Sequence, residues 1–268
     1  MQIASATSSP PSGRALVPRE HGAYGQLAMP LLTALAIGRP GLASVTLSAS
    51  VVLAFVAHES LLVVLGQRGK RALETDGPRA RRLLGLLGTL SALSGALGIA
   101  LAPAAARWAL LLPAALALAV GWLVLRRLEK TAAGEMVVAA ALSSCGLAVA
   151  LAGGASLASS IACFFTWVLA FVAATLAVQV VLIRARSKGR SDPGRTDAAI
   201  VATLLAGSFA AVPLAGLPGA APLALAPSAL LSAAVCLSRF SPKRLRELGW
   251  AMVGSSLLTM ALLVAGLR

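Results

Sequence analysis

Charged residues are scarce in this sequence of 268 residues. They make up 12% of the chain, whereas hydrophobic residues make up 58%. An ordinary soluble domain contains about 25% charged residues. No stretch is long and polar enough to form a soluble domain by itself. The composition therefore excludes an ordinary soluble enzyme or binding module and indicates a protein that lies within a membrane.

Several catalytic signatures are also missing. The sequence contains no Walker A motif, no GxSxG nucleophile motif and no HExxH zinc motif. It has no run of Arg at every third position, which is typical of a voltage sensor. The acidic pairs Glu74/Asp76 and Asp192/Asp197 fall in polar stretches and do not form a DDxxD-like magnesium site. No motif therefore points to nucleotide, acyl or metal-dependent chemistry.

Cysteine is rare, and its pattern is uninformative about chemistry. Cys145, Cys163 and Cys236 lie inside or at the edge of apolar segments, and none stands in a CxxC motif. Free cysteine behaves as a small apolar packing residue. We expect neither a disulfide nor a zinc site from these positions, and the sequence predicts no cofactor.

The sequence instead contains nine apolar segments of roughly the length that spans a bilayer. Lipid offers no hydrogen bonds to a backbone, so these segments are expected to be helices, and their uniform hydrophobicity argues against a β-barrel. The sequence therefore predicts an all-α, polytopic membrane helical bundle with about nine transmembrane helices. The expected segments are 23–37, 43–66, 83–102, 108–125, 134–153, 156–183, 198–217, 221–237 and 248–267.

Basic residues alternate between the connections of these segments. The N-terminal tail and the even-numbered connections hold all 23 Lys and Arg residues except Arg39, Arg107 and Arg268. Cytoplasmic loops carry an excess of Lys and Arg, so the N-terminus is predicted inside and the C-terminus outside. The net charge of +14 lies in short loops beside apolar segments. It therefore fits anionic lipid headgroups and insertion topology better than nucleic acid.

A tail and one domain follow from this pattern. Residues 1–18 are polar and predict a disordered cytoplasmic tail, and residues 19–268 predict a single transmembrane domain. The first apolar segment is short and contains Pro30. An alternative is a cleaved signal peptide ending near Ala34-Leu35-Ala36. The third segment carries Ser91, Gly95 and Gly98 at a spacing that lets helices approach closely.

Few ionisable residues lie at membrane depth, where such groups suggest function. Two clusters fall toward the inner face. The first holds Arg19, Glu20, His21 and Tyr24, and the second holds His58 and Glu59. The two His and two Glu residues are candidates for one polar patch. A hydrogen-bond and ion-pair network with Arg19 or Gln179, a ligand contact, and a metal site are all compatible with this pattern.

Other candidate substrate-binding residues flank the later segments. Glu135 opens the fifth segment, and its carboxylate either complements the helix dipole or contacts a headgroup. Lys130, Gln179 and Arg184 lie near the same face. The basic loops 67–82 and 184–196 either hold a phosphate or diphosphate or serve only as topology determinants and lipid contacts.

The opening of the first segment resembles a known family. Residues 18–24, PREHGAY, are similar to the PREHGAW-type opening of the YwiC-like bacterial membrane proteins. The basic loop after the second segment and residues 180–186, VVLIRAR, are also similar, and the likeness extends over nearly the whole chain from Pro18. The resemblance implies a polytopic membrane protein of undefined activity and supplies no catalytic residues.

A second resemblance concerns architecture. UbiA-type prenyltransferases also have nine helices, with functional loops after the second and sixth, which here are the two most basic loops. The Lys130-Thr131 step is similar to a Lys-Arg-x-Thr stretch of that family. The aspartate motifs that hold magnesium diphosphate are missing, and His58, Glu59, Gln179 and Arg184 stand in those regions instead. A UbiA-like arrangement is thus suspected without magnesium-dependent prenyl transfer.

These patterns favour a protein of the bacterial plasma (inner) membrane that binds an isoprenoid or other anionic lipid in a cytoplasm-facing cavity. An alternative is a small-solute or ion transporter with His58, Glu59 and Glu135 on its path, and a third is a membrane scaffold without a small ligand. The sequence decides neither whether the protein is an enzyme nor its oligomeric state.

Overall fold

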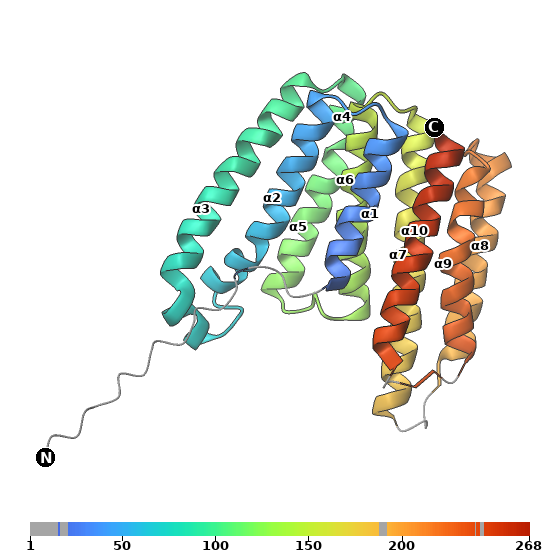
Figure 1. The fold of residues 1–268 in the computed structure, drawn as a ribbon. Helices are drawn as coiled ribbons and strands as arrows, with labels where there is room; N and C mark the ends of the chain where they lie inside the picture. The colour runs from blue at the N-terminus through green and yellow to red at the C-terminus, as the bar shows by residue number, and fades with distance from the viewer. Residues whose placement is uncertain (1–15, 17–20, 188–191, 239, 242–243) are drawn as a thin grey trace, which may run out of the picture. The chain divides into compact units, whose positions relative to one another are not determined.

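The computed structural model describes residues 16, 21–187, 192–238, 240–241 and 244–268. These residues form helices and no strand. The helices (Figure 1) are α1 (His21–Ile37), α2 (Leu42–Val64), α3 (Lys70–Leu101), α4 (Ala104–Ala109), α5 (Leu111–Leu125), α6 (Ala132–Ala152), α7 (Leu157–Arg186), α8 (Gly194–Ala215), α9 (Ala220–Leu237) and α10 (Leu245–Leu267).

The all-α, polytopic character predicted from the sequence is confirmed. Within the described residues, 8 helical segments are long and apolar enough to cross a membrane, with α4 and α5 together forming one of them. Helix α1 is apolar but shorter, at 17 residues, and contains Pro30. Each of the nine expected segments coincides with one of these helical segments. The chain is therefore an integral membrane protein of the multi-pass type.

The basic stretch 67–82 differs from the prediction, since most of it is helical. Helix α3 begins at Lys70 and runs for 32 residues. At 1.5 Å per residue it extends about 48 Å, which exceeds the roughly 30 Å hydrocarbon core. Hydropathy detects only the apolar part of a helix. The residues before it include Ala, Leu, Lys, Arg and Glu, which all favour helix, so α3 begins earlier than its apolar part. Glu74 and Asp76 therefore lie on a helix and not in a loop.

The chain divides into two compact units. Unit 1 comprises Leu16 and residues 50–93, and unit 2 comprises the described residues of 21–49 and 94–268. In unit 1, the hydroxyl groups of Ser50 and Ser91 each donate to the other's backbone carbonyl oxygen at 2.8 Å. Leu16 is the described residue of the N-terminal tail, and it packs with Val63 and Ala80. The disordered state expected for the rest of the tail falls on residues outside the described part and stays a prediction.

Unit 2 is built around α6 and α7, which pack against each other. Helix α7 also packs against α9, and α1 packs against α6, α7 and α10 (Figure 1). Small residues permit these approaches. A Cβ atom at Gly146 would lie 3.1 Å from the carbonyl oxygen of Pro30. A Cβ atom at Gly98 would lie 2.7 Å from the side chain of Leu47, so α3 approaches α2 at a glycine of the expected small-residue pattern.

Helix α1 forms part of the core of unit 2. Thr33 and Ala34 are completely buried, and Leu27 and Leu31 are nearly so. The indole nitrogen of Trp167 on α7 donates to the hydroxyl oxygen of Thr33 at 3.1 Å. Removal of this segment would expose the surfaces of α6, α7 and α10 that pack on it. The first helix is therefore part of the packed core of unit 2 in this structure, and the alternative of a cleaved signal peptide stays a prediction.

Candidate functional site

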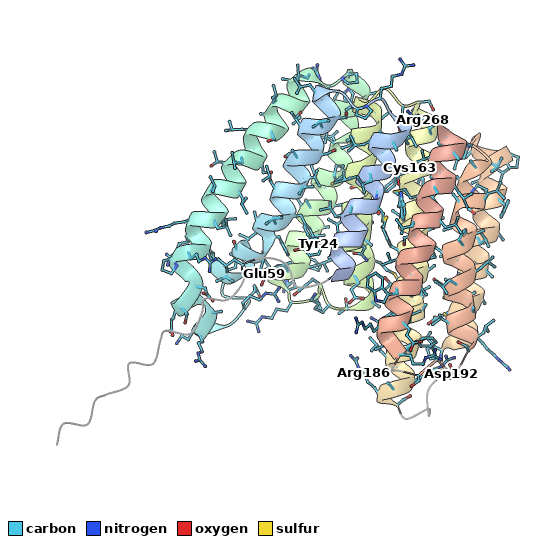
Figure 2. The ribbon with its side chains drawn as sticks, viewed as in Figure 1. Tyr24, Glu59, Cys163, Arg186, Asp192 and Arg268 are labelled. Carbon is cyan, nitrogen blue, oxygen red and sulfur yellow. The ribbon has the colours of Figure 1, made fainter. Side chains whose placement is uncertain are left out.

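The basic residues of unit 2 gather at one end of its helices. Arg39, Arg107 and Arg268 mark the opposite end, and Figure 2 shows Arg268 far from Arg186 and Asp192. We call the following residues, which lie at the ends of α5 and α7 or the starts of α6, α8 and α10, the basic end: Arg126, Arg127, Lys130, Arg184, Arg186, Arg195, Arg244 and Arg246.

Glu135 and Gln179 meet at this end. Thr131 caps α6 by accepting the amide hydrogen of Gly134 at 3.1 Å, which places Glu135 in the first turn. The amide nitrogen Nε2 of Gln179, on α7, donates to Oε2 of Glu135 at 3.4 Å. Both interpretations of Glu135 are compatible with this geometry, because the carboxylate lies at a helix N-terminus and is half-buried beside a neutral amide.

The connection between α5 and α6 is tightly folded. A Cβ atom at Gly134 would overlap the carbonyl oxygen of Leu128 and lie 2.9 Å from the Cα of Glu129. Oε2 of Glu129 is buried and has no hydrogen-bond partner among the described residues. Lys130 is exposed beside it. This corner therefore presents basic side chains outside and holds a carboxylate oxygen inside.

Arg184 has a structural role that the sequence did not reveal. Its Nε donates to Oδ1 of Asp192 at 2.8 Å, and its Nη1 and Nη2 donate to the carbonyl oxygens of Ser238 and Cys236 at 2.5 and 2.6 Å. The same Asp192 oxygen accepts the amide hydrogen of Gly194 at 2.9 Å. Arg184 thus joins the end of α7, the start of α8 and the end of α9.

In unit 1, Glu59 is paired with an arginine. Its two carboxylate oxygens accept from Nε and Nη2 of Arg68 at 2.9 and 2.5 Å, which is the bidentate geometry that guanidinium favours. The Glu59 side chain is 4% exposed and the Arg68 side chain 30%. His58 is half-buried beside this pair, and the buried hydroxyl of Ser60 has no hydrogen-bond partner in the described part of the chain.

The N-terminal cluster is described only in part. Arg19 and Glu20 lie outside the described residues, and His21 is described through its backbone, which begins α1. Tyr24 is exposed on α1. The polar patch expected from this cluster with His58 and Glu59 stays a prediction. Within the described ranges, no group of three or more His, Cys, Asp and Glu side chains is placed to hold a metal ion.

Two partners were missed at the level of sequence, Arg68 for Glu59 and Asp192 for Arg184. Each acid and its arginine stand eight or nine residues apart across a helix end. That separation carries no periodic signal, because the reversal of the chain between the two residues decides whether they meet. Knowledge of where α2 and α7 end was therefore needed to find the pairs.

Comparison with known proteins identifies the family. A model of the family described as YwiC-like protein matches residues 17–150, which run from before α1 to near the end of α6. The similar stretch 180–186 lies beyond this match. No curated protein and no solved structure matches the chain. The match covers half of the sequence, and the chain belongs to the YwiC-like family.

Proposed function

We propose that this YwiC-like protein lies in the bacterial plasma membrane with its basic end in the cytoplasm, and that it binds an isoprenoid or other anionic lipid there. The observation that carries the proposal is the segregation of basic side chains to one end of unit 2. This segregation supports a cytoplasmic orientation for that end. Each basic residue near a membrane surface also attracts anionic headgroups by about 1 kcal/mol.

The Glu135–Gln179 pair supports a polar headgroup contact within this end. The 3.4 Å separation makes the contact a weak hydrogen bond. The second oxygen of the carboxylate and the oxygen of the amide remain as acceptors for hydroxyl or amine groups of a ligand. Lys130 lies on the α5–α6 connection that leads into the same helix and supplies a positive charge for a phosphate. We include Tyr24 in the proposed site because α1 packs on α6, and we include Arg19, Glu20 and His21 because they stand next to it in the sequence.

Two of the candidate residues fit structural roles better. Arg184 donates to one carboxylate and two carbonyl oxygens, which favours a role in holding three helices together. Glu59 forms a bidentate ion pair with Arg68, which favours a structural role over a place on a transport path. Lipid binding is therefore proposed in preference to transport. Transport would need the side chains of His58, Glu59 and Glu135 to contact the solute along its path.

Thermal unfolding of the purified full-length protein tests the proposal. Neutral detergent micelles are supplemented with phosphatidylglycerol, farnesyl diphosphate, or the uncharged controls phosphatidylcholine and farnesol. A ligand that binds only the folded state raises the unfolding temperature in a concentration-dependent manner. We expect a rise with the two anionic probes and not with their controls. Equal behaviour of all four probes would contradict the proposal.

A further inference from the structure

One helix end is built from a residue that suits it poorly. Helix α5 ends in a Schellman motif, in which the amide of Arg127 donates to the carbonyl of Val124 at 3.0 Å and the amide of Leu128 donates to that of Leu123 at 2.8 Å. This motif requires a left-handed backbone at its first residue beyond the cap. Arg127 adopts it with φ 58°, and it is the one non-glycine residue with positive φ in the described chain.

The same motif occurs elsewhere in this chain with glycine. Helix α2 ends with Gly66 at φ 70°, where Gly66 and Gln67 donate to Val63 and Leu62. Helix α6 ends with Gly154 at φ 80° and the corresponding pair of hydrogen bonds. Glycine adopts this conformation without steric cost, whereas a side chain with a Cβ atom is strained in it. Geometry alone therefore favours glycine at position 127.

The surroundings of Arg127 indicate what its side chain contributes. Arg127 is exposed, and it forms no ion pair with a described carboxylate. The guanidinium of the preceding Arg126 lies 5.7 Å from the ring centre of Trp122, a cation–π contact. Trp122 is 54% exposed one turn before the end of α5, a position typical of tryptophan at a membrane–water interface. The corner thus presents two consecutive, exposed arginines at the end of α5, which is the expected level of lipid phosphates.

We propose that Arg126 and Arg127 form a phosphate-binding site at the α5–α6 corner, and that Arg127 is retained in a strained conformation because its charge is needed there. The inference deepens the proposed function by naming the residues and the ligand chemistry, and it rests on that proposal. The phosphate belongs either to a membrane lipid headgroup or to a soluble diphosphate. Strained residues that persist in a fold are concentrated at ligand-binding positions.

Three substitutions separate charge from backbone strain. Arg127→Gly removes both, Arg127→Asn removes the charge with a residue that tolerates the left-handed region, and Arg127→Lys keeps both. Arg246→Asn is the matched control, because Arg246 is exposed at the same basic end and its loss removes the same charge. Binding of the full-length protein is measured in phosphatidylcholine nanodiscs with added phosphatidylglycerol and, separately, in neutral detergent with inorganic diphosphate.

We expect Arg127→Gly and Arg127→Asn to weaken anion binding by clearly more than fivefold, because a phosphate held by two arginines loses more than the general attraction of one basic residue to the membrane surface. Arg127→Lys should bind as the unchanged protein does, and Arg246→Asn should weaken binding by no more than about fivefold, the effect of one basic residue near a membrane surface. Without ligand, Arg127→Gly should raise the unfolding temperature by about 2 °C, since the strain is relieved. A response to phosphatidylglycerol alone identifies a lipid headgroup, and a response to both probes identifies phosphate of either source.

Three results would overturn the inference. Unchanged binding by Arg127→Asn would show that the Arg127 charge is not used, although the proposed function would stand if the unchanged protein still responds to anionic lipid. Equal weakening by Arg246→Asn would show that only the total charge of the basic end matters. Absence of any response by the unchanged protein would remove the proposed function and the inference together.

Discussion

The indole nitrogen Nε1 of Trp167 lies 3.1 Å from the hydroxyl oxygen Oγ1 of Thr33 and donates a hydrogen bond to it. Both side chains are buried, and the same Thr33 hydroxyl donates to the carbonyl of Met29 at 2.7 Å. Trp167 also stacks on Phe171 with ring centres 5.4 Å apart. This contact joins the first helix of the chain to α7, which lies at the centre of unit 2.

The bond between α1 and α7 predicts a measurable coupling. Thr33→Val removes the acceptor with little change in shape, and Trp167→Phe removes the donor together with part of a buried ring, so each should lower the free energy of unfolding. Interhelical hydrogen bonds in membrane proteins contribute about 0.6 kcal/mol on average, and we expect a coupling energy of this size in a double-mutant cycle. Additive single effects would mean that the bond contributes nothing to stability.

The close approach of α1 and α6 predicts an asymmetry between two glycines. Gly146 leaves no room for a side chain, since a Cβ atom would lie 3.1 Å from a backbone oxygen of Pro30. Gly121 on α5 has nothing within 4 Å of its Cβ position. Gly146→Leu should lower the free energy of unfolding by at least about 2 kcal/mol through overpacking, and Gly121→Leu should leave it nearly unchanged. Unfolding in detergent measures both, and equal losses would contradict the packing.

The Glu59–Arg68 pair predicts that removing the arginine alone lowers the free energy of unfolding more than removing both charges does. Arg68→Met leaves a buried carboxylate unpaired, which should cost about 2 kcal/mol because Arg68 is itself partly exposed. Adding Glu59→Gln to Arg68→Met should recover much of this loss. Arg71→Met, at an exposed position on α3, is the control. The prediction would be wrong if the double variant were less stable than Arg68→Met alone.

The contacts of Arg184 predict a stability effect in the absence of any ligand. Lysine cannot reproduce the three separate directions in which the guanidinium donates. Arg184→Lys should therefore lower the free energy of unfolding by about 2 kcal/mol. Arg186→Lys, at the exposed last residue of α7, should leave it unchanged. If Arg184 served only to bind an anion, its replacement would leave ligand-free unfolding unchanged.

Hydropathy and charge patterning were sufficient to predict the membrane-spanning helices, because a segment that crosses lipid must be apolar and charged residues remain in the connections. Segment 221–237, for example, lies entirely within α9. Helix ends were predicted less well where they are polar, as at Lys70, since bilayer thickness sets the apolar length and not the helix length. Glu135 and Gln179 were both predicted as site residues, and the packing of α6 on α7 brings them together. That these two residues meet, and that Glu59 pairs with Arg68, depends on how the helices pack and where they end, which no local sequence pattern shows.

The orientation of the chain underlies the proposed function, and a pair of C-terminal fusions tests it most directly. Alkaline phosphatase, active only outside the cytoplasm, or green fluorescent protein, fluorescent only inside, is joined after Arg268 of the full-length protein. We expect an active phosphatase and a dark fluorescent protein, because the basic end would then face the cytoplasm. An inactive phosphatase with a bright fluorescent protein would contradict the account and remove the proposed cytoplasmic lipid site.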